Sequence, residues 1–191
     1  MEIEDKVFVL TKLVEQCSRN NAKAQMQLYR MFSQSMYNTS LRITGNKNLA
    51  EDVMQEAFLS AFEKIKNCKT PEHFGSWLKR IVINRSIDEI RKKRISLIPL
   101  EETLPLADDS PEYNPEEEME QEKLLEYIKK AITLLPDGYR IVLTLKLLED
   151  YDYSTIAKDL DLAESTVRSQ FVRGRQKLLE IIENLKKEQN E

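Results

Sequence analysis

The residues best suited to a chemical role are basic side chains concentrated in residues 74–94, FGSWLKRIVINRSIDEIRKKR. From Trp77 to Arg94, seven basic residues stand against two acidic ones, a net charge of +5 in a chain whose net charge is −4. Positive charge beside aromatic rings suits a phosphate backbone and a stacked base. A solvated helix with a cationic last turn, which the helix dipole favours, gives the same pattern. These residues alone leave both interpretations open.

Groups able to catalyse bond chemistry are scarce in the sequence. It contains one histidine, His73, and two isolated cysteines, Cys17 and Cys68, so the ligand clusters of a zinc site are missing. It also has no glycine-rich phosphate loop and no nucleophile constellation. We therefore expect no enzyme activity, no metal and no cofactor. Both cysteines are expected to be reduced thiols, and a regulatory disulfide is the alternative.

The composition favours helices. Of 191 residues, 41% are hydrophobic and 32% are charged, while glycine (4) and proline (6) are scarce, which is typical of an all-α fold with one or two small cores. Apolar runs are too short to span a membrane, and the acidic N-terminal stretch does not fit a secretory signal. The protein is therefore expected to act in the cytoplasm without membrane insertion.

The first part of the chain predicts helices over residues 5–18, from Ala22 to about Gly45, over 48–66 and over 74–94. Thr70 and Pro71 suit the cap and first position of the last helix. Its apolar stripe is Trp77, Leu78, Ile81, Ile87 and Ile90. The helix at 48–66 has the most regular stripe: Ala50, Val53, Met54, Ala57, Phe58, Ala61, Phe62 and Ile65. Its other face is mostly acidic, which indicates either a solvated face or a surface for a basic partner.

Residues 95–122 contain ten acidic residues and no basic one, and four prolines interrupt them. Proline blocks regular helix and like charges repel, so we predict an extended linker at 95–115 between domains at 1–94 and 116–191. Helices are expected at 116–135, 139–148, 152–160 and 164–187, the third capped by Asp152. The helix at 139–148 is almost wholly apolar and is expected to be buried.

The last two helices have the spacing of a helix-turn-helix, so the predicted fold is two small helical domains, the second containing that motif. Its expected core is Ile156, Ala157, Leu160, Leu162, Val167 and Phe171 or Leu178. Residues 164–177 carry four basic residues and one acidic one, a net charge of +3 that suits a recognition helix in the major groove. The alternative is an amphipathic helix that closes a small bundle.

Three segments in this order resemble a bacterial RNA polymerase sigma factor of the extracytoplasmic-function (small sigma-70) type. They are AEDVMQEAFLSAFEKI, the stretch at 74–94, and LLPDGYRIVLTLKLLEDYDYSTIAKDL followed by ESTVRSQFVRGRQKL. The resemblance implies a subunit that binds core RNA polymerase, recognises the −10 and −35 promoter elements and promotes DNA melting. An anti-sigma factor is a candidate further partner.

The resemblance also implies roles for single residues. The coiled coil of the polymerase's largest subunit would contact Asp52, Gln55 and Glu56. The −10 element would contact Lys69, Phe74, Arg80, Asn84, Arg85, Arg91, Lys92 and Arg94, with residues 67–74 holding a flipped base. The −35 element would contact Thr166, Arg168, Ser169, Arg173, Arg175 and Lys177. Trp77 is assigned to packing first and to DNA second.

The chain departs from the family pattern in its second domain. Asp161 stands where the turn usually has glycine, and Ala163 replaces the usual serine cap, so that Ser165 would cap the recognition helix or the helix would fray. Gln170 stands where a basic residue is common, and Gly174 replaces an alanine. A rival hypothesis is a helix-turn-helix regulator whose first domain senses a signal, but it leaves the paired acidic and basic helices at 48–94 without a role.

Overall fold

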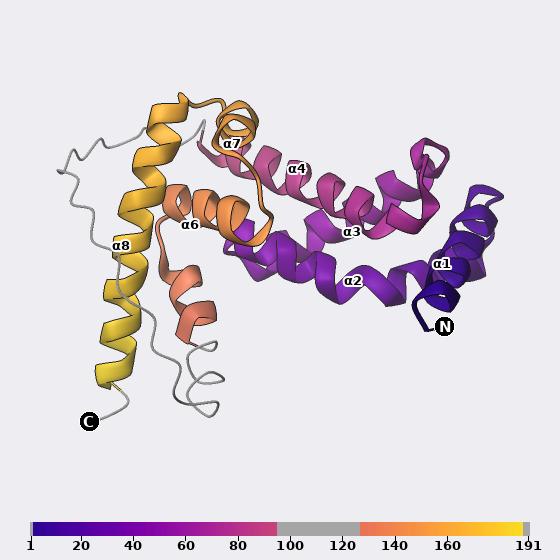
Figure 1. Cartoon of the computed structure of the whole chain (residues 1–191), viewed down its shortest axis with the longest axis horizontal. Helices are drawn as coiled ribbons and strands as arrows, with labels where there is room; N and C mark the ends of the chain where they lie inside the picture. The colour runs from indigo at the N-terminus through magenta and orange to yellow at the C-terminus, as the bar shows by residue number, and fades with distance from the viewer. Residues whose placement is uncertain (1, 95–126, 189–191) are drawn as a thin grey trace. The chain divides into compact units, whose positions relative to one another are not determined.

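The computed structural model describes residues 2–94 and 127–188, and the chain divides into two compact units, Met1–Lys93 and Arg94–Glu191 (Figure 1). Within the described residues every regular element is helical, as the all-α prediction requires. The predicted linker at 95–115 lies outside the described residues, so it and the domain boundaries derived from it stay predictions. Each unit is considered by itself.

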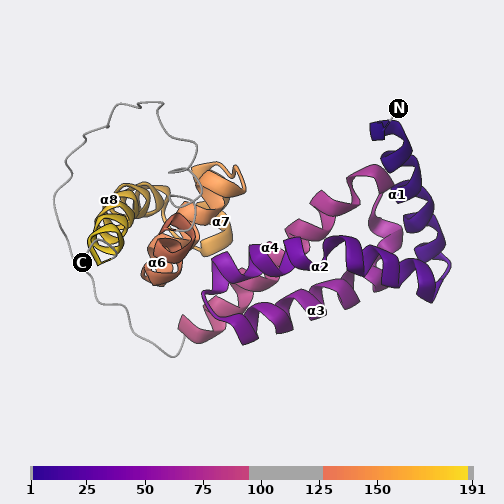
Figure 2. The same cartoon turned by 90° about the horizontal axis from the view of Figure 1, so that it is seen from below.

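The first unit contains α1 (Glu2–Ser18), α2 (Ala22–Thr44), α3 (Lys47–Glu63), the 3₁₀ turns η1 (Ile65–Asn67) and η2 (Pro71–His73), and α4 (Phe74–Arg94) (Figure 2). Local chemistry sets several of these ends. The side chain of Asn21 accepts from the backbone of Lys23 and Ala24, and Gly45, at φ 65°, closes α2 in the left-handed conformation.

Two details of this unit differ from the sequence-based expectation. The third helix ends at Glu63 rather than continuing to residue 66, because the chain tightens into η1. Thr70 does precede Pro71 at the start of η2, but its side chain makes no capping hydrogen bond. The cap of α3 is Asn46, whose side chain accepts from the backbone N–H of Leu49 at 3.0 Å.

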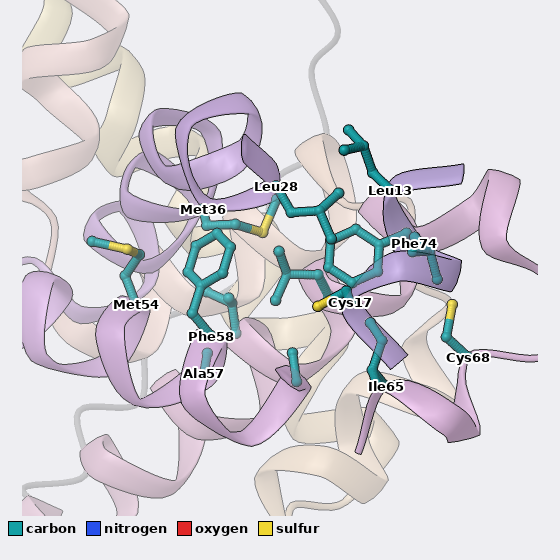
Figure 3. Close-up of a cluster of buried hydrophobic side chains, with 14 of the residues drawn as sticks. Leu13, Cys17, Leu28, Met36, Met54, Ala57, Phe58, Ile65, Cys68 and Phe74 are labelled. Atoms are coloured by element: carbon teal, nitrogen blue, oxygen red, sulfur yellow. The ribbon is translucent and has the colours of Figure 1, made fainter. Parts of the chain in front are cut away.

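The core of the first unit gathers side chains from all four of its helices (Figure 3). The predicted stripe of α3 is buried at every position except Phe62, which is half-buried. In α4 the predicted Leu78, Ile87 and Ile90 are buried, whereas Trp77 and Ile81 are half-buried. The stripe prediction missed four further buried residues of α4, Phe74, Val82, Ile83 and Ser86. The Ser86 hydroxyl lies 3.0 Å from that of Ser40, so a buried hydrogen bond joins α4 to α2.

The described part of the second unit begins with a helix over residues 127–134 and continues with α6 (Asp137–Leu143), a π-helical turn η3 (Thr144–Leu148), α7 (Tyr153–Leu160) and α8 (Glu164–Glu188). The single buried helix expected at 139–148 is therefore wrong in two ways. It is divided between α6 and η3, and Leu147 is 55% exposed. Glycine at position 174 allows α8 to lie close to α6, since a Cβ there would sit 3.2 Å from Cβ of Tyr139.

Helices α7 and α8 form the predicted helix-turn-helix. Asp152 caps α7 by accepting from the Thr155 backbone N–H at 2.6 Å. Asp161 adopts the left-handed conformation at φ 54°, and the N–H of Leu162 reaches back to the Ala157 carbonyl at 2.9 Å, which is a Schellman turn. The predicted core is buried at Ile156, Ala157, Leu160 and Val167, and half-buried at Leu162, Phe171 and Leu178. An aspartate thus fills the turn position that usually requires glycine.

Candidate nucleic-acid interface

The acidic face of α3 points away from its buried stripe. Asp52, Gln55 and Glu56, the residues expected to bind core polymerase, are all exposed. Gln55 and Glu56 follow Asp52 by three and four residues, so the three side chains share one side of the helix. This side is therefore open to a basic partner.

An ion pair joins this acidic face to the basic helix. The Nη1 atom of Arg85 in α4 lies 2.7 Å from a carboxylate oxygen of Glu56, and both side chains are partly exposed. The two residues are 29 positions apart, so spacing within one helix gives no sign of the pair. Arg85, expected to contact DNA, and Glu56, expected to contact polymerase, therefore contact each other in the free chain.

The connection between α3 and α4 places its two candidate residues very differently. Lys69 is exposed, whereas Phe74 is fully buried. The Phe74 ring packs against Phe32 at 5.5 Å and Trp77 at 5.9 Å between ring centroids. In this structure Phe74 supports the connection from inside the core, and its predicted contact with DNA would require the ring to leave that core.

The remaining candidates of α4 lie along its solvent side. Arg80, Asn84 and Arg91 follow one another at intervals of four and seven residues, which places them in one row. Arg80 and Asn84 are exposed, and Arg91 is half-buried with Asp88 4.0 Å away. Lys92 is exposed and donates to Glu89 at 2.6 Å, a hydrogen bond that raises the pKa of the Lys92 ammonium. Helix α4 ends at Arg94, whose side chain lies outside the described set.

The six candidates of α8 divide into two rows on opposite flanks of its buried stripe, since successive residues are about 100° apart around the axis. One row contains Thr166, Ser169, Arg173 and Lys177. The other contains Arg168 and Arg175, and both of these guanidinium groups lie over aromatic rings. Arg168 is 4.4 Å from the ring centroid of Tyr153, and Arg175 is 6.0 Å from that of Phe171.

Two residues near Arg168 were missed by the sequence-based assignment. Glu164, one turn earlier, accepts hydrogen bonds from Arg168, and the spacing of four residues between them could have indicated the pair. Tyr153 belongs to the preceding helix, so its contact with Arg168 depends on how α7 packs against α8 and leaves no local signal. The cap predicted for Ser165 also has a different outcome: Ser165 lies inside the first turn, where its carbonyl accepts from Ser169 Oγ.

Other kinds of site find no support among the residues that the structure describes. No three His, Cys, Asp or Glu side chains there come together as metal ligands. Among the described helices, none combines the length and apolar character that crossing a bilayer requires. Cys17 and Cys68 are both free and buried, and burial raises the pKa of each thiol.

Comparison with known proteins agrees with this arrangement. Residues 28–95 match the family model of Sigma-70 region 2, and residues 125–178 match that of Sigma-70, region 4. The chain is 28% identical over 186 residues to the ECF RNA polymerase sigma factor SigW of Bacillus subtilis (strain 168), covering 93% of this chain and 99% of that protein. It is 30% identical over 135 residues to the ECF RNA polymerase sigma-E factor of Escherichia coli (strain K12), covering 65% of this chain and 69% of that protein.

A solved structure of CnrH in complex with the cytosolic domain of CnrY has the same fold, with a TM-score of 0.50 and 19% identity over 92% of this chain and 97% of that one. The two family matches fall on the two units in the order expected from the sequence, the first over the acidic and basic helices and the second over the helix-turn-helix. The chain belongs to the extracytoplasmic-function group of RNA polymerase sigma factors, whose sigma-70 regions 2 and 4 bind core polymerase and promoter DNA.

Proposed function

We propose that this sigma factor uses three distinct surfaces to start transcription and that it performs no bond chemistry of its own. The acidic face of α3, with Asp52, Gln55 and Glu56, binds the coiled coil of the polymerase's largest subunit. The solvent side of α4, with Lys69 beside it, contacts the −10 element. Helix α8 contacts the −35 element. The protein acts in the cytoplasm, where polymerase and promoter are found.

The observation that carries this proposal is the pairing of opposite charges on neighbouring helices of one unit. The α3 face is acidic and exposed, whereas α4 carries the basic row, and Glu56 and Arg85 meet at 2.7 Å. An acidic strip attracts and orients a basic partner, while a basic row attracts phosphates. The first unit can therefore bind polymerase through the acidic face of α3 and promoter DNA through the neighbouring basic row of α4.

Promoter opening follows from binding energy alone. Contacts of α8 and α4 with duplex DNA position the factor on the promoter. Capture of an unstacked base near the connection between α3 and α4 then offsets the free energy of unstacking, which is roughly a few kcal/mol. Asn84 and Arg80 lie on the exposed row of α4 and supply polar contacts at the edge of the opened region. Phe74 keeps the connection in shape from within the core.

Reconstituted transcription tests the proposal directly. Added to core polymerase, the protein should start transcripts at particular promoters, and Asp52→Lys combined with Glu56→Lys should abolish both core binding and transcription. A control with the same change in charge elsewhere, Glu15→Lys with Glu183→Lys, should keep both, because these exposed residues lie on α1 and the C-terminal half of α8. Copurification of the first double variant with polymerase would show that this face is wrongly assigned. Duplex binding without transcription would favour a conventional helix-turn-helix regulator.

We also propose that an anti-sigma factor is a partner of this chain. The solved CnrH structure contains the cytosolic domain of a second protein, CnrY. Exposed apolar side chains of the second unit, Leu134, Leu147 and Leu148, would suit an apolar partner surface. Isolation of the protein from its host under non-inducing conditions, followed by mass spectrometry, should recover a stoichiometric partner that blocks core binding. Recovery of the protein bound to core polymerase alone would argue against such a partner.

A further inference from the structure

The first turns of α8 contain an arginine that is held in place from two sides. The carboxylate oxygen Oε1 of Glu164 accepts hydrogen bonds from Nε of Arg168 at 3.1 Å and from its Nη2 at 2.5 Å. Both side chains remain accessible, with 58% of Arg168 and 44% of Glu164 exposed. Glu164 occupies the first turn of the helix, where the dipole favours a carboxylate. The pair is therefore ordered and still open to DNA.

The second contact comes from the other helix of the motif. The Arg168 guanidinium lies 4.4 Å from the ring centroid of Tyr153, a distance at which the ring face attracts the cation. Tyr153 is itself fixed, because it is the first residue of α7, directly after the Asp152 cap, and its ring forms a T-shaped pair with that of Phe171, with 5.7 Å between the centroids. The orientation of the guanidinium plane is thus tied to the packing of α7 on α8.

This arrangement leaves one side of the guanidinium available. Glu164 occupies the edge formed by Nε and Nη2, so the edge formed by Nη1 and Nη2 can still donate two parallel hydrogen bonds. Two such donors match the O6 and N7 acceptors of guanine in the major groove. The Glu164 carboxylate partly neutralises the charge of the Arg168 guanidinium. This weakens its attraction to a phosphate more than it weakens a pair of directed hydrogen bonds to a base. N-terminal residues of a recognition helix are also those that reach base edges.

We infer that Tyr153 and Glu164 are positioning residues that hold Arg168 for bidentate recognition of one guanine in the −35 element. The inference rests on the proposed role of α8 at that element. In this arrangement the −35 preference of the chain depends in part on Tyr153, a residue outside the recognition helix. It also assigns different tasks to the basic residues of α8: Arg168 reads a base, whereas Lys177, further along, contacts the backbone.

The test uses the full chain with core polymerase and a promoter library randomised across the −35 element. Wild-type holoenzyme should enrich sequences with guanine at one position, and Arg168→Ala should reduce that preference by roughly tenfold or more. Glu164→Gln and Tyr153→Leu should reduce it at the same position by roughly two- to fivefold, while Tyr153→Phe, which keeps the ring, should retain it. Glu183→Gln, an exposed change on the same helix, is the matched control.

A mutant cycle and a salt titration separate positioning from a general structural role. In the Arg168→Ala background, Glu164→Gln and Tyr153→Leu should have no further effect on the guanine preference. Lys177→Ala should instead weaken binding to all sequences and reduce the salt dependence by about one phosphate contact. Circular dichroism melting of the Tyr153 variants detects any loss of fold, and Glu164→Gln, at an exposed site, supports or overturns the inference independently of them.

The outcomes distinguish this inference from the function on which it rests. If wild-type holoenzyme enriches no −35 sequence, the proposed role of α8 fails and the inference fails with it. If it enriches a sequence but Glu164→Gln leaves the preference intact, only the positioning role is overturned. Uniform weakening by Arg168→Ala, with a smaller salt dependence, would mean that Arg168 contacts a phosphate and would also overturn it.

Discussion

The two basic helices of the molecule hold their charged side chains in different ways. Helix α4 is buried along most of its length, at Phe74, Leu78, Val82, Ile83, Ser86, Ile87 and Ile90. Helix α8 is four residues longer, yet among its described residues only Val167, Gly174, Ile182 and Leu185 are buried. The basic groups of α4 are therefore positioned by the core beneath them. Those of α8 depend more on contacts between side chains at the surface, such as that of Arg168 with Glu164 and Tyr153.

The largest effect expected from this difference is on stability. Leu78→Ala in α4 should lower the free energy of unfolding by about 2–5 kcal/mol, because it removes a fully buried side chain and leaves a cavity. The same change in α8, Leu179→Ala, should cost less than about 0.5 kcal/mol, because Leu179 is exposed. Urea denaturation followed by circular dichroism measures both. Equal losses would mean that the core of α4 does not determine its position.

A change at the closest approach of α8 to its neighbour should have the next largest effect. Gly174→Leu should lower the stability of the second unit by about 1–3 kcal/mol, because an added Cβ alone would lie 3.2 Å from Tyr139 and 3.3 Å from Leu143. Thermal melting of the variant measures the loss. Asn184→Leu places the same side chain at an exposed position of the same helix and should change little. A neutral Gly174→Leu would show that α6 and α8 can separate freely.

The buried hydrogen bond between α2 and α4 should show strong coupling. Ser86→Ala should cost about 1–2 kcal/mol, because it removes a partner from the Ser40 hydroxyl, which is also fully buried. Replacing both residues by alanine should cost less than the sum of the two single changes, because no buried hydroxyl is then left without its partner. Chemical denaturation of the four proteins in the cycle measures the coupling. Strict additivity would exclude a stabilising bond between the two hydroxyls.

The smallest expected effect concerns pH and the helix-turn-helix. The backbone N–H of Thr155, which donates to Asp152, lowers the pKa of that carboxyl below its ordinary value of 3.8. Because the pKa is lower in the folded chain, the ionised cap stabilises α7 at pH values above the pKa of the unfolded chain. This contribution disappears as the pH falls through the pKa of the folded chain. Melting temperatures between about pH 2 and 5 should therefore drop less in Asp152→Asn, since asparagine also caps helices without titrating. Identical pH profiles would contradict this role of the carboxylate.

Features set by local chemistry were predictable from the sequence. The stripe of α3 repeats at intervals of three and one, so its burial could be assigned almost completely, and α4 was assigned the bounds that the structure has. The cap at Asp152 was also predictable, since aspartate is a preferred cap residue. The left-handed turn at Asp161 followed from the family pattern, because aspartate tolerates that conformation where glycine is usual. The family could be assigned because three such segments occur in a fixed order.

Features set by contacts between distant residues were not predictable. The pair Glu56–Arg85 joins two helices, and the contact of Tyr153 with Arg168 depends on how α7 packs against α8. Phe74 was assigned to DNA because the family resemblance places a pocket for a flipped base at residues 67–74, but only the packing of Phe32 and Trp77 around it reveals that it is buried. Leu147 was assigned to the interior because its neighbours are apolar, whereas the π turn directs it outward.

The position of the two cysteines allows the opening of the first unit to be measured by itself. Cys17 and Cys68 are the only cysteines in the 191 residues, and both are buried in the core of the first unit. A thiol reagent can modify them only when that core opens, so the rate of labelling gives the opening free energy of this unit while the second unit contributes no signal. Core polymerase that binds the closed form of α3 and α4 would slow the labelling of both cysteines.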